Sequence, residues 1–324
     1  MRSSIFVVRA LLGATLCFGP AAAVANDYPS KPVRMVVAAP AAGAVDLMGR
    51  YMCEKFAQSW GQPCVVENKP GASGMIGIDA VVKSAPDGYT LAMVPSNMVM
   101  IPTMYDRVPY DTLKDLAPVA LVSSTPIMIG AHTSFPAKSF QEFLAYAKAN
   151  PGKVDYTSCG PATPQHVAGE WLMSLARIEA THIPFKGCAP AFADVLSGRI
   201  PVFISTVAHF EPQIKAGKLI GFAVTEATRT DFAPQYPTVA ESGFPGYAVS
   251  VWFGIVAPAG TPAAIVAKLN ADANRALKQA DLNAKLRSQH YQPMGGTPEQ
   301  FGALIRSEVE KYGKVIRAVG IKPN

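Results

Sequence analysis

The chain has 324 residues, 49% of them hydrophobic and 16% charged, and a formal net charge of +6. This is more residues than a domain with a single hydrophobic core usually contains, which indicates two lobes. The excess of basic residues is small and forms no cluster, which argues against a nucleic-acid partner.

The N-terminus has the pattern of a secretory signal peptide. Arg2 and Arg9 accompany a short apolar stretch, and small residues ending in Ala25 follow. We therefore expect a signal peptide over residues 1–25, cleaved after Ala25, and a periplasmic protein. An uncleaved anchor is the alternative. The mature chain would carry a charge of about +4, because the leader removes two basic residues and no acidic one.

The segments from residue 33 to residue 97 alternate between strand and helix patterns. Expected strands cover 33–39, 62–71 and 88–97, and expected helices cover 45–60 and 74–85. Asp46 is expected at the N-cap of the first helix or beside it. This alternation indicates a parallel sheet with helices on its faces.

The alternation of strand and helix patterns is interrupted in the run "LAPVALVSSTPIMIGAHTSF", where two strand-like pieces meet around Ser124. We place a crossing to a second lobe there, followed by a second series of strands and helices. "SVWFGIVAPAGTP" is the expected return strand, and a last helix is expected to begin near Pro298. The expected lobes comprise residues 26–123 with 248–324, and residues 124–247. Two crossings between two α/β lobes make a hinged cleft.

Four cysteines remain after cleavage: Cys53, Cys64, Cys159 and Cys188. An even number in an oxidising compartment favours disulfides, and the spacings fit no zinc pattern, so no metal is expected. Three pairings are possible. We expect the two local ones, Cys53 with Cys64 and Cys159 with Cys188; buried free thiols are the alternative.

Eight segments in chain order carry a family resemblance: "YPSKPVRMVV" with "PAAGAVD", "GQPCVVENKPGASGMIGIDAV", "SAPDGYTL", "YTSCGPATPQHVAGE", "HIPFKGCAPAFADVLSGRI", "AGKLIGFAVT", "YPTVAESGFPGY" and "VWFGIVAPAGTP". Together they resemble the Bug family of extracytoplasmic solute receptors, which serve tripartite tricarboxylate transporters. The matched loops around Cys159 and Cys188 also favour that pairing.

The resemblance implies an α/β periplasmic binding protein of the Venus flytrap type (type II), each lobe a mainly parallel sheet flanked by helices. It implies a monomer without cofactor or catalysis, which holds a dicarboxylate, tricarboxylate, acidic amino acid or aromatic carboxylate between its lobes. The ligand would pass to membrane subunits of the transporter. One departure is visible: relatives commonly have Pro-Pro-Gly-Gly where this chain has Ala42 before Gly43, so a positive φ at Ala42 is not expected.

The first candidate binding loop comprises Ala42, Gly43, Ala44 and Asp46. Free N–H groups at the start of a helix suit a carboxylate, although a tight turn capped by Asp46 has the same sequence. Ser96 and Asn97, after the third strand, are expected to line the cleft from the same lobe.

The second lobe supplies the expected opposing clamp. Its candidate donors are Ser158, Thr163 and Gln165, with His166 either contacting the ligand or bonding within the protein. Lys186 would pair with a carboxylate unless it is solvated, and Gly187 permits a close backbone approach. Ser205 and Thr206 are further candidates for lining the cleft.

Rival functions have weaker support. "GASGMIG" is not the G-x-G-x-x-G of a dinucleotide site, and a periplasmic hydrolase would lack a G-x-S-x-G nucleophile elbow. The five histidines are scattered and show no metal-ligand spacing. A receptor that presents its ligand to a signalling kinase would share every feature described here.

Overall fold

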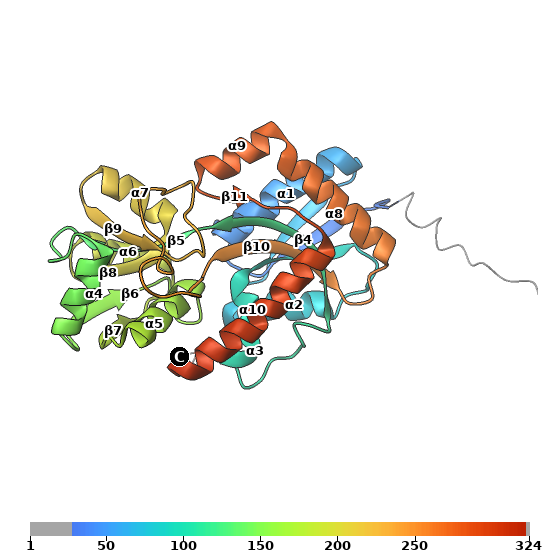
Figure 1. Cartoon of the computed structure of the whole chain (residues 1–324). Helices are drawn as coiled ribbons and strands as arrows, with labels where there is room; N and C mark the ends of the chain where they lie inside the picture. The colour runs from blue at the N-terminus through green and yellow to red at the C-terminus, as the bar shows by residue number, and fades with distance from the viewer. Residues whose placement is uncertain (1–27, 322–324) are drawn as a thin grey trace, which may run out of the picture.

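The protein is described by a computed structural model over residues 28–321, so the predicted signal peptide lies outside the described residues. Two sheets, each flanked by helices, form two lobes (Figure 1). The predicted two-lobed α/β fold is confirmed. Within residues 28–321, no helix combines the length and the apolar character needed to span a bilayer.

Lobe 1 contains a six-stranded sheet of order β11-β4-β10-β3-β1-β2. Its strands are β1 (Val33–Val37), β2 (Cys64–Asn68), β3 (Thr90–Pro95), β4 (Leu116–Thr125), β10 (Val251–Pro258) and β11 (Gln292–Pro293). Its helices are α1 (Ala44–Trp60), α2 (Met75–Val82), α3 (Ile101–Met104), α8 (Ala263–Lys278), α9 (Ala280–Ser288) and α10 (Pro298–Val319), with short 3₁₀ turns η1 (Ala72–Gly74) and η2 (Ser96–Val99).

Lobe 2 contains a five-stranded sheet of order β7-β6-β8-β5-β9. Its strands are β5 (Ile127–His132), β6 (Val154–Thr157), β7 (Ala180–Ile183), β8 (Val202–Thr206) and β9 (Leu219–Val224). Its helices are α4 (Phe140–Ala149), α5 (Pro164–Ala176), α6 (Cys188–Leu196) and α7 (Val207–Lys215).

Both sheets are mixed, which corrects the prediction of mainly parallel ones. In lobe 1, β1 pairs in parallel with β2 and β3, whereas β10 is antiparallel to both β3 and β4. In lobe 2, β5 is antiparallel to β8 and β9. The reason is the crossing itself: β4 leaves lobe 1 and β10 returns to it, so these neighbours run in opposite directions. Every residue of β10 is buried, which makes this strand the centre of the lobe-1 core.

The chain changes sheets between Thr125 and Ile127, and returns between β9 and β10. At the first crossing the Ile127 N–H donates to Glu226 Oε1 at 3.1 Å, which ties the two crossing segments together. Helix α10 belongs to lobe 1 but also contacts α5 of lobe 2, and Figure 1 shows its C-terminal end beside α5 and α3. The lobe limits set at residues 123 and 248 stay a prediction.

Both expected disulfides are formed. Cys53 on α1 bonds to Cys64 at the start of β2, and Cys159 after β6 bonds to Cys188 at the start of α6. The first bond ties a helix to the edge of the lobe-1 sheet. The second joins two loops of lobe 2.

Candidate functional site

A cavity of about 780 Å³ lies between the lobes. Lobe 1 contributes residues 71–73 and Tyr105 to its lining, and lobe 2 contributes residues 159–162 and 184–187. The two loops from lobe 2 follow the C-terminal ends of β6 and β7. The 71–73 loop likewise follows the C-terminal end of β2. In open α/β sheets this is the edge where ligands bind.

The lobe-1 wall is a loop of four successive residues with positive φ: Gly71 (124°), Ala72 (46°), Ser73 (56°) and Gly74 (99°). The neighbouring structure holds this strained backbone in place. Asn97 Nδ2 donates to the Ser73 carbonyl at 2.9 Å, and a Cβ on Gly74 would lie 3.0 Å from the Ala38 carbonyl. Positive φ at a residue other than glycine costs free energy, and backbone strain of this kind clusters at functional sites.

The lobe-2 wall consists of two loops that touch. A Cβ on Gly160 would lie 2.5 Å from the Phe185 carbonyl, so glycine is required at this contact, where φ is also 115°. The Cys159–Cys188 bond links the same two loops. Thr163 caps α5 by accepting the His166 N–H at 3.2 Å, and its own hydroxyl donates to the Gly160 carbonyl at 2.7 Å. This wall is therefore fixed by covalent, steric and hydrogen-bond constraints.

The electrostatics of the cavity favour an anion. Lys186 is the charged residue in the lining, and no lining residue within 28–321 is acidic. Helices α2, α5 and α6 begin beside the cavity loops, and none has an acidic residue in its first turn. Uncompensated helix N-termini carry partial positive charge and free N–H groups.

Lys186 and Gly187, both predicted site residues, line the cavity. Gly187 has φ of 111°, and a Cβ there would meet nothing within 4 Å, so the backbone faces open space. The other predicted binding residues of lobe 2 are not among the residues that line the cavity. Gln165 is buried in the first turn of α5.

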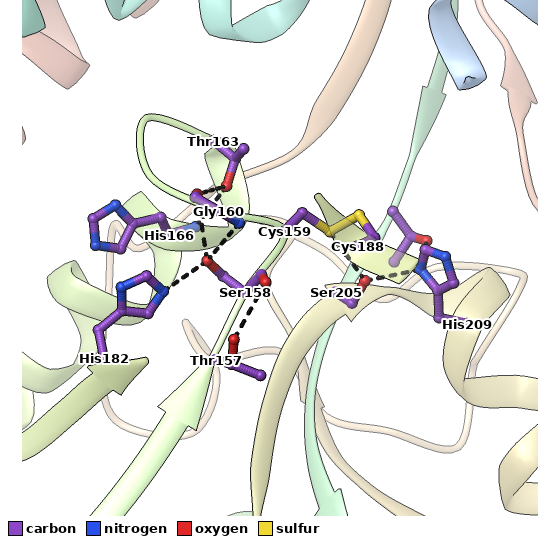
Figure 2. The surroundings of a disulfide bond; sticks show 11 residues. Thr157, Ser158, Cys159, Gly160, Thr163, His166, His182, Cys188, Ser205 and His209 are labelled. Carbon is purple, nitrogen blue, oxygen red and sulfur yellow. Dashed lines mark hydrogen bonds between the residues drawn. A yellow bond between two sulfur atoms is a disulfide. The ribbon is translucent and has the colours of Figure 1, made fainter. Parts of the chain in front are cut away.

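Ser158 is buried and engaged within the protein. Its Oγ lies 2.9 Å from His182 Nε2, as Figure 2 shows. Burial and the neighbouring His166 lower the pKa of His182 to about 4, against an opposing effect of Glu170. The His182 ring is therefore neutral at neutral pH and supports the loop without adding charge.

His166 stacks on His182 with ring centroids 4.1 Å apart. Its Nε2 lies 3.6 Å from Glu170 Oε1, while its buried Nδ1 has no hydrogen-bond partner among the described residues. The two alternatives predicted for this residue, ligand contact or internal support, therefore both keep a structural basis.

Ser205 lies beside the Cys159–Cys188 bond and His209 (Figure 2), and Thr206 follows it as the last residue of β8. Their hydroxyls lie 2.8 Å and 3.1 Å from His209 Nδ1. Ser205 also lies 3.5 Å from Cys159 Sγ. These residues support the disulfide loop, and their direct contact with a ligand stays a prediction.

The Ala42 to Asp46 loop corrects two expectations. Gly43 is the N-cap of α1 and Asp46 lies in its first turn. Ala42 has φ of 63°, contrary to the expectation from its side chain. The reason is the Asp46 carboxylate, whose Oδ2 accepts the Ala42 N–H at 2.8 Å and holds the strained turn.

Asp46 itself is buried and fully partnered. Arg50 Nε donates to its Oδ2 and Asn68 Nδ2 to its Oδ1, each at 2.9 Å. Burial alone would raise the pKa of this carboxyl, but the hydrogen bonds from Arg50, Asn68 and Ala42 outweigh it and lower the pKa. Helix α1 thus has its own anion at its N-terminus, and a ligand role for residues 42–46, Ala44 included, stays a prediction.

Ser96 and Asn97 follow β3 as predicted and lie in η2. Ser96 is fully buried. Asn97 holds the strained 71–74 loop through the Ser73 carbonyl. We place Asn97 as a support of the lobe-1 wall.

The sequence patterns did not point to residues 71–73 and Tyr105, which line the cavity from lobe 1. "GASG" entered only as part of a segment that carries the family resemblance and as a rejected dinucleotide-binding pattern. Its two glycines and small residues at the end of a strand were the available signal for a loop with unusual φ values. Tyr105 follows a helix of four residues and has no such signal.

Comparison with known proteins places the chain in a family. Residues 48–321 match the family described as tripartite tricarboxylate transporter family receptor. The chain is 33% identical over 307 residues to BugT of Bordetella pertussis, covering 94% of each protein. It is similar to R. palustris Rpa4515 solved with adipate (TM-score 0.81, 30% identity, 92% of this chain and 100% of that chain).

It is also similar to MatC of Rhodopseudomonas palustris, solved with bound malate (TM-score 0.77, 29% identity, 89% of this chain and 100% of that chain). The family and these neighbours are periplasmic solute receptors and not enzymes. The chain belongs to the tripartite tricarboxylate transporter receptor family, which includes the Bug proteins.

Proposed function

We propose that this receptor captures a small carboxylate in the interlobe cavity and delivers it to a tripartite tricarboxylate transporter. The observation that carries the proposal is the charge of the cavity. Among the described residues its lining contains Lys186 and no acidic side chain, and three helices begin nearby without an acidic residue in their first turn. A carboxylate would receive N–H donors and meet positive potential from both lobes.

The comparisons support the ligand class. One similar receptor was solved with adipate and another with malate. Both molecules are short dicarboxylates, so we propose a dicarboxylate ahead of the other carboxylates that the resemblance allows.

A thermal-shift screen tests the ligand class. Malate, adipate, citrate, glutamate and benzoate are compared with adipamide, which keeps the length of adipate without its charge. A carboxylate present at about one hundred times its dissociation constant should stabilise the protein by about 2.7 kcal/mol, while adipamide has no effect. If no carboxylate raises the melting temperature and an ester or amide is hydrolysed instead, the receptor proposal fails.

Lys186→Met tests the cation of the cavity. Loss of a charge-assisted hydrogen bond should weaken dicarboxylate binding about tenfold in calorimetric titration, and should reduce the salt dependence of the dissociation constant. Lys148→Met is the matched control, because Lys148 is an exposed lysine near the end of α4 in the same lobe. Equal affinities for the two variants would remove Lys186 from the site.

The finer points of the proposal need separate measurements. The mass of the exported protein should correspond to a chain that begins at Asn26, and light scattering should give one chain per particle. Membrane fractions should retain the ligand-bound receptor only when the transporter subunits are present. Retention by a sensor kinase instead would favour the signalling alternative.

A further inference from the structure

Tyr105 occupies a junction between cavities. It follows α3 and lines the interlobe cavity, and it also lines a second cavity of about 490 Å³ between the end of α3 and the end of α10. Among the residues that line these two cavities, Tyr105 is the shared one. Tyr105 therefore borders both cavities.

The position of the Tyr105 ring is fixed by a hydrogen bond. Its hydroxyl lies 2.7 Å from Ser73 Oγ, and Ser73 belongs to the strained loop of the lobe-1 wall. Asn97 holds that loop from behind. The ring is thus attached to a strained and internally bonded segment of the lobe-1 wall, which suits it to act as a wall of defined position.

The second cavity offers room and a cation. Arg317, on the last turn of α10, lines it together with Thr103 and Asp106. Within residues 28–321, Arg317 makes no ion pair, whereas Arg50, Arg199 and Arg229 each pair with a carboxylate. A ligand that extended past Tyr105 would enter this space.

We propose that Tyr105 sets the maximum ligand length, so that the receptor selects short dicarboxylates and rejects longer ones. The inference rests on the proposed function, because it concerns the same cavity. Shortening the side chain would join the two cavities and lengthen the site on the lobe-1 side. Enlarging the side chain would shorten it.

The test measures dissociation constants for a homologous series, namely succinate, adipate, suberate and sebacate. The wild-type protein should bind the shorter members best. Tyr105→Ala should improve suberate and sebacate relative to succinate by about fourfold for each methylene that the joined cavity accommodates. Tyr105→Phe keeps the ring but loses the hydrogen bond to Ser73, so its length limit should relax less than that of Tyr105→Ala. Tyr105→Trp should weaken adipate relative to succinate.

Controls separate this inference from its premise. Tyr51→Ala removes a tyrosine of lobe 1 that hydrogen-bonds to Gln289 instead of lining the cavity, and should leave the length profile unchanged. Arg317→Gln in the Tyr105→Ala background should reduce the gain for long ligands. An unchanged profile in both the Ala and Trp variants would overturn the role of Tyr105. Absence of binding by the wild-type protein to every member would instead overturn the proposed function.

Discussion

Removal of the Cys159–Cys188 bond should weaken ligand binding as well as the fold, whereas removal of Cys53–Cys64 should weaken the fold alone. The bond spans 29 residues, and Cys53–Cys64 spans 11. With these loop sizes the chain-entropy relation gives losses of about 3.6 and about 2.8 kcal/mol in the free energy of unfolding. The two double Cys→Ser variants should therefore have similar stabilities, the first slightly lower.

Their affinities should differ, since only one bond holds the binding surface. Cys159 lines the cavity, and Cys188 follows directly after lining residue Gly187. Without the bond, the two loops must be ordered when the ligand binds, and fixing one residue costs about 1–2 kcal/mol. We expect at least about a tenfold loss of dicarboxylate affinity for Cys159→Ser/Cys188→Ser. Cys53→Ser/Cys64→Ser should bind like the wild-type protein, because neither residue lines the cavity.

Urea unfolding at equilibrium measures the free energy of unfolding, and calorimetric titration with malate and adipate measures the dissociation constants. Both are performed at a temperature where each variant is fully folded. The reasoning is refuted if the two variants lose affinity equally, or if the Cys159/Cys188 variant binds as tightly as the wild-type protein. An equal loss would mean that affinity follows overall stability, and an unchanged affinity would mean that contacts such as Gly160 with Phe185 define the wall without the bond.

Two further predictions concern strain and pH. Ala42→Gly should raise the free energy of unfolding by up to about 1 kcal/mol in urea titration, because it relieves positive φ at a residue with a Cβ; a destabilised variant would show that the Ala42 side chain contributes packing. Burial raises the pKa of Glu226 to about 8 from its ordinary value of 4.5. Its stabilising contribution is therefore complete below pH 4.5 and is lost as the pH rises through 8. Glu226→Gln should remove a loss of a few kcal/mol between pH 5 and pH 9 in unfolding curves, and a pH profile identical to that of the wild-type protein would contradict the assignment.

The alternation of strands and helices was predictable because it depends on local patterns. Buried strands such as β10 are continuous apolar runs, and α1 and α10 repeat apolar residues at helical spacing. The first crossing was also visible, since two strand-like pieces meet around Pro126 without a helix between them, and at the second crossing no helix separates β9 from the return strand β10. The direction of the strands was not predictable, because the return of β10 beside β4 is a property of the assembled lobes.

The site was less predictable because its backbone conformations depend on distant partners. Positive φ at Ala42 requires the Asp46 carboxylate, which Asn68 holds from 22 residues away. The 71–74 loop requires the contact of Gly74 with Ala38. Tyr105 enters the cavity from a segment without periodicity. Lys186 and Gly187 were found because a cation and a glycine between a strand and a helix signal an anion loop by composition.

The central position of β10 has a consequence for how the chain becomes folded. All strands of lobe 2 lie between Ile127 and Val224, so its sheet is complete once one uninterrupted stretch has emerged. The sheet of lobe 1 instead lacks its middle strand until Val251–Pro258 arrives to fit between β3 and β4. Joining such distant segments costs more loop entropy and is slower than local pairing. Lobe 2 can therefore reach its native state first, and lobe 1 closes around the last part of the chain.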